Sequence, residues 1–342
     1  MSIIRQVGRF AKRVIYGDTL LPGEFTIGLK LPQSEVKVSL EGFGAPLDVT
    51  FRHTVACCAP FLVGVLLDRP YSTSVRENRK IVLRFSESVS PGRLLGELHL
   101  APTTSIPLGN SEVTLFRVTG SRNYCLSMVR QWAHYLPSAF SNWRRLASFD
   151  VKMTAREMRA SYVGFIRPHP IVLGSIQSDT GGNIFPMNLM GELSDRYFAF
   201  ALKGSRRPSH LIANLRHIAI SNIPLPLCST AFQLAANHKK DSIEWDQLPF
   251  QLSESQTLKF PIPAAAGRVR ELSVEQVHKL GSHTLFLARI LSDESRYDEP
   301  QLHAIHGFYQ YWRLRKDRAQ LRASIEEDWA NKHAQSRTMV AP

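Results

Sequence analysis

The sequence predicts a mainly β protein with flanking helices, arranged as two successive halves of similar pattern. From Leu29 to about Met128, short runs rich in β-branched and aromatic residues alternate with Gly, Pro, Asn and Ser, which is typical of an antiparallel sandwich or barrel. A helical stretch follows over residues 129–160. The β pattern then resumes at Ile171, and the chain closes on a second helical stretch, over residues 302–332, with one apolar face.

The expected strands can be placed from these runs. In the first half they are VKVSL (36–40), LDVTF (47–51), FLVGVLL (61–67), KIVLRF (80–85), LLGELHL (94–100), EVTLFRV (112–118) and NYCLSMV (123–129). In the second half they are IVLGSI (171–176), a strand from Asn183 after a tight turn at 179–182, YFAFALK (197–203), HIAISNI (217–223), ELSVEQV (271–277) and HTLFLARIL (283–291).

Self-comparison of the chain favours an internal repeat. At an offset of 137 residues, Phe61 aligns with Phe198 and Ile81 with Ile218, together with Arg69, Ser72 and Arg79 and their counterparts. Farther on, Gly120-Ser121 aligns with Gly281-Ser282, and His134, Trp143 and Arg144 align with His303, Trp312 and Arg313. The alternative is two unrelated β-rich domains of similar composition.

Composition limits the class of protein. The 342 residues suffice for two domains, and 42 basic against 29 acidic side chains give a net charge of +13, which favours anionic ligands. Residues 1–160 hold 21 basic and 12 acidic side chains, whereas residues 161–342 hold 21 and 17. The four cysteines have no zinc or CxxC spacing and no apolar run reaches the ~20 residues of a membrane helix, so we expect a cytoplasmic protein without a membrane span.

The N-terminal residues 1–28 form a basic segment whose start is amphipathic. Arg5, Arg9, Lys12 and Arg13 alternate with apolar residues at helical spacing. An anionic membrane surface and an ordinary docking helix both remain open for it. Basic and aromatic residues also interleave over 308–318, but the spacing there fits a helix with a buried aromatic stripe, so nucleic-acid binding is not expected.

Several catalytic motifs are missing from the chain. Gly42 and Gly44 lack the third glycine of a dinucleotide fingerprint, and no P-loop, GxSxG or HExxH motif occurs. His303 and His306 have helical spacing, but an isolated HxxH is no metal site, so no metal is expected.

An anion cradle is the one constellation that the residues support. Lys203, Ser205, Arg206, Arg207 and Ser209 fall in a loop between an expected strand and an expected helix. Cations, hydroxyl groups and the free N–H groups of a helix N-terminus all attract a phosphate. The alternative is a solvated basic loop.

Four ordered segments of the second half, within about residues 160–315, resemble the flavin reductase-like family of FMN-binding split barrels. Residues 166–170 (IRPHP) are similar to the family's Pro-rich strand entry, and residues 183–190 (NIFPMNLM) to its N-x-x-P-x-S-x-F signature. Residues 248–250 (LPF) and 280–290 (LGSHTLFLARI) match two later segments. Asn188 and Met190 depart from the family's usual hydroxyl and aromatic residues, and Pro208 replaces a common acid.

The resemblance implies a flavin site and assigns residues to it. Asn183, Pro186, Met187 and Asn188 would line the flavin ring and ribityl chain. The FMN phosphate would lie on the cradle residues Lys203, Ser205, Arg206, Arg207 and Ser209, with His283, His306 and Tyr309 near the ring edge. No protein side chain is assigned as the catalytic group, because the flavin would carry the chemistry.

The resemblance also implies a domain plan: an N-terminal segment (1–28), a degenerate split-barrel domain (29–157), an FMN-binding split barrel (158–315), and a C-terminal helix and tail (316–342). The two tandem barrels would form an intramolecular pseudo-dimer, with the chain a monomer or a homodimer. Since the position matching Asn188 in the first half lies near Arg52, and no N-x-x-P-x-S motif occurs there, we expect one flavin site.

The expected function is NAD(P)H-dependent flavin reduction by hydride transfer to flavin N5. The cofactor would be FMN, or FAD, with NAD(P)H as co-substrate and an electron-accepting enzyme as a candidate partner. Two alternatives stay open. One is a flavin-dependent oxidase or oxygenase acting on an organic substrate, and the other is a non-catalytic protein that binds flavin or another anion.

Overall fold

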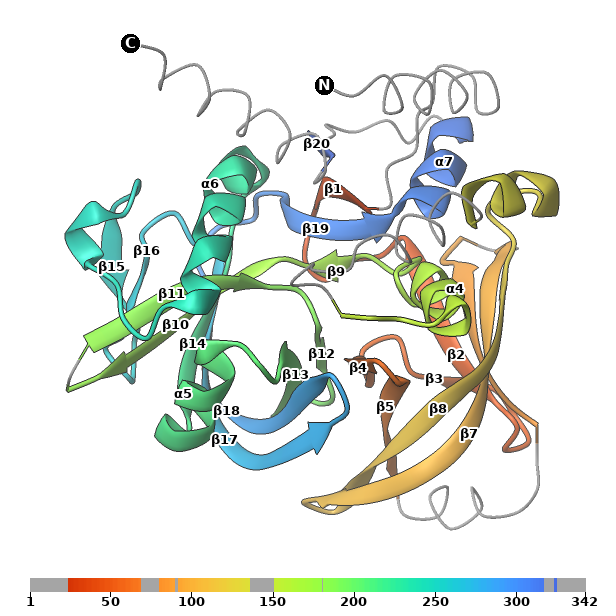
Figure 1. Cartoon of the computed structure of the whole chain (residues 1–342), viewed down its shortest axis with the longest axis horizontal. Helices are drawn as coiled ribbons and strands as arrows, with labels where there is room; N and C mark the ends of the chain where they lie inside the picture. The colour runs from red at the N-terminus through yellow and green to blue at the C-terminus, as the bar shows by residue number, and fades with distance from the viewer. Residues whose placement is uncertain are drawn as a thin grey trace.

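Two seven-stranded antiparallel sheets form the body of the molecule. The structure is a computed structural model, and it describes residues 24–68, 80–89, 92–135, 151–179, 181–316 and 323–324. The first half, from red to orange in Figure 1, contributes β2 (Val36–Glu41), β3 (Leu47–Asp48), β4 (His53–Cys58), β5 (Phe61–Asp68), β6 (Ile81–Glu87), β7 (Leu94–Leu108) and β8 (Ser111–Asn123). The second half, from green to blue, contributes β10 (Val172–Ser178), β11 (Gly181–Met187), β12 (Met190–Glu192), β13 (Tyr197–Lys203), β14 (His217–Asn222), β17 (Arg268–Leu280) and β18 (His283–Ser295).

The two sheets have the same strand order. The first runs β3-β2-β6-β7-β8-β5-β4 and the second β11-β10-β14-β17-β18-β13-β12, so each strand has a counterpart at the same position. The pattern of burial explains the curl of the first sheet around a core, because β2 alternates buried Val36, Val38 and Leu40 with more exposed residues. The mainly β class and the tandem split barrels predicted from the sequence are confirmed.

A small third sheet ties the ends of the chain together. Its order is β20 (Ala323–Ser324), β1 (Glu24–Leu29), β19 (Gln301–His306) and β9 (His169–Pro170). β1 pairs with β19 along its whole length, from Glu24 opposite His306 to Leu29 opposite Gln301. In Figure 1 this sheet lies above both halves and bridges them.

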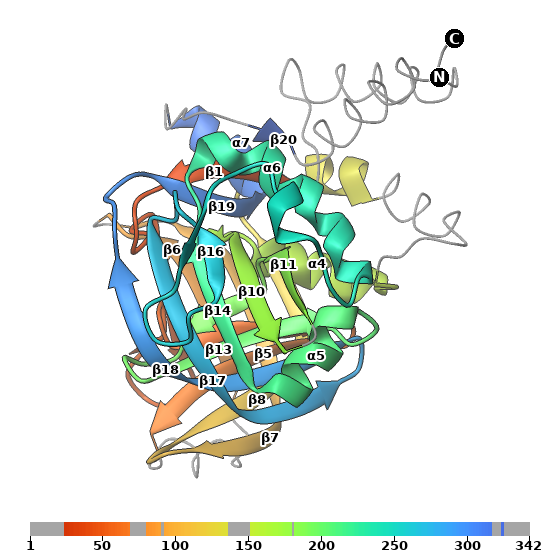
Figure 2. The ribbon, with the colours of Figure 1, turned by 90° about the vertical axis from the view of Figure 1, so that its left-hand side faces the viewer.

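Helices cover the outer faces of the sheets. Figure 2 shows α5 (Arg207–Leu215) and α6 (Cys228–Gln233) on the side of the second sheet that faces away from the first half. α4 (Ala155–Gly164), which begins at a Thr154–Glu157 capping box, packs on β7 and β8. α7 (Gly307–Arg315) belongs to the second half of the chain but buries Phe308, Tyr309 and Trp312 in the core of the first. The remaining elements are η1 (Leu225–Leu227), η2 (Leu234–Lys239), η3 (Trp245–Gln247), β15 (Leu252–Glu254) and β16 (Pro261–Pro263).

The halves meet through a shared apolar cluster and through the tips of their long hairpins. Leu62 and Leu66 of β5 pack in one cluster with Ala199 of β13 and Leu285 of β18. The tip between β17 and β18 docks on the β4–β5 turn, where the Ser282 amide donates to the Ala59 carbonyl oxygen at 2.8 Å. The reciprocal tip, between β7 and β8, lies against Tyr197 at the start of β13. This reciprocity gives the single chain the geometry of a two-fold dimer interface.

Three sequence-based expectations are wrong. Residues 302–306 form strand β19 and not the start of a helix, because this short apolar run is buried between β1 and β9. The periodicity of so short an apolar run does not distinguish a strand from a helix. β8 ends at Asn123 and residues 128–135 are helical, so no strand covers 123–129. Residues 323–324, expected within a C-terminal helix and tail, form strand β20. The sequence runs also gave no separate sign of β4 and β12.

Two of the aligned pairs are also corrected. Gly120 lies inside β8, and the true counterpart of the Gly281 turn is Gly109, since both glycines have left-handed φ angles, of 55° and 60°. His134 is helical whereas His303 lies in β19. The alignment of Phe61 with Phe198 and Ile81 with Ile218 does fall on corresponding strands. The expectations for residues 1–23, for Arg69, Ser72, Arg79, Trp143 and Arg144, and for most of 316–342 lie outside the described residues.

Candidate functional site

The basic loop after β13 folds into the first turn of α5. The Arg206 amide donates to the Lys203 carbonyl oxygen at 3.0 Å and the Ser209 amide donates to that of Arg206 at 3.1 Å, so the five cradle residues occupy one compact turn. No side chain caps α5 and no acidic residue lies in its first turn, unlike α4. Cations at the positive end of a helix are unfavourable for stability, and a bound anion would offset that repulsion.

The 3-10 helix η2 packs beside this turn. His238 donates from Nε2 to the Pro186 carbonyl oxygen at 2.9 Å. Burial, with the charge of Arg206, lowers the pKa of His238 to about 4, so its ring is neutral near neutral pH. Arg207 lies 3.6 Å from Asp241, in an exposed ion pair that is of small energetic value.

The turn also adjoins the joint between the two halves. Lys203 pairs with His283 across β13 and β18. His283 Nδ1 lies 2.8 Å from the Ser282 hydroxyl and 3.9 Å from the sulfur of Cys57, which belongs to β4 of the first half. Burial, and then the charge of Lys203, lowers the pKa of His283 to about 4. The cation cluster and a buried neutral imidazole therefore lie side by side at the joint.

Asn188 lies in the link between β11 and β12, at the same end of the sheet. Ala201 donates its amide to the Leu189 carbonyl oxygen at 2.8 Å, and this register places Asn188 beside the last residues of β13. Asn188 and Pro186 are half-buried and lie at the edge of the sheet. Pro186 is linked to the cradle through His238, which bonds to its carbonyl oxygen and feels the charge of Arg206.

Asn183 and Met187 have other surroundings. Asn183 is fully buried and its amide donates to the carbonyl oxygens of Asn237, at 3.1 Å, and Lys240, at 2.8 Å, which fastens the C-terminal end of η2 to β11. Met187 packs in the core of the second barrel. Neither side chain lies at the surface where a cofactor would reach it.

His306 and Tyr309 are not brought to the cradle. His306 caps α7, with its Nδ1 accepting from the Phe308 amide at 3.1 Å, and its ring stacks on Tyr162 at 3.9 Å. Tyr309 donates its hydroxyl to Glu35 at 2.9 Å. Both lie among the residues that fill the first barrel, whereas the cradle belongs to the second.

The first half carries a different chemistry at the equivalent place. In the first half, Asp68 and Ser111 are the last pair between β5 and β8, beside the β7–β8 turn. In the second half, Lys203 and His283 are the last pair between β13 and β18, beside the β17–β18 turn. Arg52 directly precedes β4, as Leu189 directly precedes β12, and it forms an ion pair with Asp68 at 3.0 Å. Ser111 also donates to Asp68, at 3.1 Å. A carboxylate that already forms an ion pair therefore stands in the first half where the second half has Lys203. The counterparts of residues 204–209 lie outside the described residues.

Sequence reasoning missed the contribution of the first half to this region. Cys57, Cys58 and Ala59 contact Ser282 and His283 across more than 220 residues of sequence, and no local pattern could reveal that contact. All four cysteines are free thiols. Within the described residues, no group of three or more His, Cys, Asp or Glu side chains is placed to hold a metal ion, and no helix is long and apolar enough to cross a membrane.

Comparison with known proteins gives matches among solved structures alone. No protein-family model and no curated protein sequence matches the chain. The FMN-binding protein from Thermus thermophilus with bound p-hydroxybenzaldehyde is 20% identical, has a TM-score of 0.35, and the match covers 44% of this chain and 82% of that one. The NADH:FAD oxidoreductase of Streptomyces globisporus C-1027 is 13% identical, with a TM-score of 0.40 and coverage of 47% and 96%. The styrene monooxygenase flavin reductase from Pseudomonas putida S12 is 17% identical, with a TM-score of 0.35 and coverage of 43% and 92%.

Proposed function

We propose that the chain is an FMN-dependent oxidoreductase that holds one flavin on the second half, beside the joint with the first. The observation that carries the proposal is the turn at the start of α5, where Lys203, Arg206 and Arg207 meet an uncapped helix N-terminus next to that joint. Such a turn binds a phosphate group through both charge and backbone N–H groups. FMN is the preferred ligand, and FAD carries a phosphate at the same place.

The residues of this region fit the phosphate end of a flavin and one edge of the molecule next to it. Ser205 and Ser209 add hydroxyl groups to the cations of the turn, and Asn188 and Pro186 lie half-buried beside it. Asn183 and Met187 support the strand that carries these residues, through the bonds to residues 237–240 and through the barrel core. The flavin-contacting set that we propose is therefore Pro186, Asn188, Lys203, Ser205, Arg206, Arg207 and Ser209.

A bound flavin would supply the redox chemistry by accepting a hydride from NADH or NADPH at N5. The chain's task is then to bind and orient. The cations of the turn fix the phosphate end, and His283, held by Ser282 and close to Cys57, keeps a neutral ring beside Lys203. Since this ring is a neutral imidazole near pH 7, without the second proton that a general acid would donate, His283 acts in the proposal as a positioning residue.

The proposal includes one site per chain and not two. The place in the first half that corresponds to Lys203 is held by Asp68, already paired with Arg52. A phosphate there would meet a carboxylate, and the arginine would have to leave its partner. The first half thus serves the second as a fixed internal partner.

The test compares FMN with riboflavin, which has the same ring but no phosphate, by quenching of flavin fluorescence on the full-length chain. FMN is expected to bind at least tenfold more tightly, because the cradle recognises the phosphate. The FMN complex, mixed anaerobically with NADH or NADPH, is expected to lose its visible absorbance. Equal affinity for the two flavins would overturn the cradle, and a bound flavin that neither nucleotide bleaches would overturn the reductase activity.

A further inference from the structure

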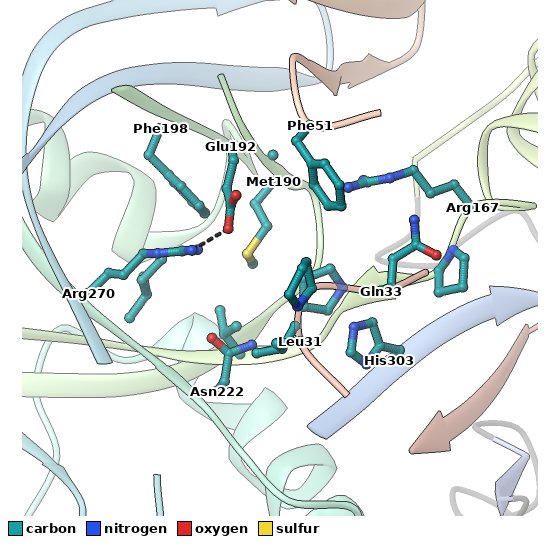
Figure 3. Close-up of a pocket in the computed structure, with 16 residues that line it drawn as sticks. Leu31, Gln33, Phe51, Arg167, Met190, Glu192, Phe198, Asn222, Arg270 and His303 are labelled. Atoms are coloured by element: carbon teal, nitrogen blue, oxygen red, sulfur yellow. Dashed lines mark hydrogen bonds and ion pairs between the residues drawn. The ribbon is translucent and has the colours of Figure 1, made fainter. Parts of the chain in front are cut away.

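A small cavity lies between the two halves, away from the cation turn, at one end of the second barrel. Its apolar wall comes from Val172, Met190, Phe198 and Ile220, and the first half closes it with Leu31, Pro32, Gln33 and Phe51. The cavity volume is about 40 Å³. That exceeds the ~10–15 Å³ that one water needs but is too small for a ring system. Figure 3 shows Arg167 and the Arg270–Glu192 pair on opposite sides of this cavity.

The charges around the cavity do not balance. Arg270 pairs with Glu192 and, at 2.8 Å, with Asp293, and Arg268 holds Asp293 through two bonds of 2.6 Å. These two arginines and two carboxylates compensate each other. Arg167 stands apart from them. Only 5% of this residue is exposed. Among the described residues, no carboxylate lies within 4 Å of its guanidinium group.

Arg167 also has a buried Nε without a hydrogen-bond partner among the described residues. Its guanidinium lies 5.3 Å from the centre of the Phe51 ring, a contact that supplies only part of the lost solvation. Burial lowers the pKa of Arg167 to about 10, so the group still carries its charge at neutral pH. The charge of Glu192 opposes this lowering, but Glu192 is bonded to Arg270 and forms no ion pair with Arg167. A buried cation that is only partly compensated is costly, which makes the site receptive to an anion.

The histidines around Arg167 add no further positive charge to the site. Burial, assisted by the charge of Arg167, lowers the pKa of His53 and His169 to about 3 and that of His303 to about 4, so all three rings are neutral near pH 7. The Nε2 of His303, on the cavity wall, has no hydrogen-bond partner among the described residues. An anion in the cavity would thus meet one fixed cation and a further polar ring atom.

We propose that this cavity binds the carboxylate of a short-chain organic acid, with the carboxylate on Arg167 and the hydrocarbon tail against Val172, Met190, Phe198 and Ile220. The planar guanidinium fork matches the two oxygens of a carboxylate. The volume and the apolar wall suit a tail of a few carbon atoms. This site is separate from the flavin cradle, and its test needs no flavin.

The test uses butyrate as the probe in equilibrium dialysis against the full-length chain at constant ionic strength. We expect saturable binding of one butyrate per chain, and no competition from the neutral isostere butyramide. Arg167→Met should weaken binding at least tenfold. Arg117→Met, which removes the same charge from an exposed position on β8, should leave the dissociation constant unchanged within twofold.

Four results would overturn the proposal: no saturable binding of butyrate, competition by butyramide equal to that by butyrate, stronger competition by inorganic phosphate, or equal affinity in folded Arg167→Met. Circular dichroism establishes whether that variant folds. If it does not, the butyramide and phosphate competitions on the unaltered chain decide the question.

Discussion

At the scale of single residues, the second half differs from the first by a reversal of charge at one position. Lys203 closes the β13–β18 ladder beside the α5 turn, and Asp68 closes the equivalent ladder of the first half, where it is paired with Arg52. The fold repeats, but the ligand chemistry of the two places does not. One substitution in the turn therefore tests what the cations do.

Arg206→Met is expected to weaken FMN binding by roughly tenfold or more, because a hydrogen bond between charged groups contributes about 1.5–3 kcal/mol. Riboflavin affinity should stay the same, since riboflavin has no phosphate. Fluorescence titration with both flavins measures the two values, and the exposed Arg117→Met is the charge-matched control. Equal losses for FMN and riboflavin would contradict the assignment of Arg206 to the phosphate.

The residue types in the sequence pointed to the basic turn at residues 203–209, but they did not reveal what the neighbouring motif residues do. Lys203 to Ser209 could be recognised because charge, hydroxyl groups and a helix start coincide within seven residues of sequence. Asn183 belongs to the predicted motif of residues 183–190, yet its amide holds the C-terminal end of η2, which lies more than 50 residues farther along the chain. A motif identifies a strand, but only the tertiary contacts show which of its side chains face a ligand.

At the scale of elements, the tips of the two long hairpins hold the halves together. Gly281 has a φ of +55° and a Cβ at this position would lie 2.3 Å from the Ala59 carbonyl oxygen. The position therefore demands glycine for two reasons, the left-handed backbone and the close approach of the β4–β5 turn. The reciprocal tip at Gly109 meets the hydroxyl group of Tyr197, a side chain that can move.

Gly281→Ala is expected to destabilise the protein by more than about 2 kcal/mol, since the strain of a left-handed non-glycine residue, about 1–2 kcal/mol, adds to the clash with backbone. Gly44→Ala is the matched control: Gly44 also has a positive φ, of +98°, but a Cβ there would meet nothing within 4 Å. Urea unfolding of both variants measures the difference. A loss of stability no larger than that of Gly44→Ala would show that the docked tip contributes little.

Periodicity predicted most of the strands correctly. It misassigned residues 302–306, where a strand precedes α7, and residues 123–129, where β8 ends. The run Leu302–His306 has an apolar pattern that fits a helix continuing into α7, but β1 and β9 bind it from both sides. The partner strand β1 comes from the other end of the chain, so no local sequence pattern near residue 302 indicates this pairing. Elements whose pairing is local, such as the β17–β18 hairpin, were correctly anticipated.

At the scale of the whole molecule, burial of neutral histidines couples stability to pH. His53 and His169 have a pKa of about 3 in the folded protein, and His238, His283 and His303 about 4, against about 6.5 in the unfolded chain. Below pH 6.5 the unfolded chain binds protons that the folded chain does not. The free energy of unfolding should therefore fall as the pH falls from 6.5 to 4, by about 1.4 kcal/mol per pH unit for each histidine.

Urea unfolding at pH 7, 6 and 5 measures this slope. His169→Gln should make it shallower by about the contribution of one proton, because its ring is fully buried and held by the Gly164 carbonyl oxygen at 3.2 Å. A free energy of unfolding that stays constant between pH 7 and pH 5 would contradict the neutral, buried state of these rings.

The central claim concerns the asymmetry of the two barrels: the second carries a cation turn that includes Lys203, and the first has Asp68, paired with Arg52, at the position of Lys203. The most direct measurement is the number of FMN molecules bound per chain, obtained from flavin absorbance and protein concentration after reconstitution with excess FMN and gel filtration. We predict one FMN per chain. Two per chain would show that the first half also binds flavin despite Asp68 and Arg52, and none would remove the flavin site altogether.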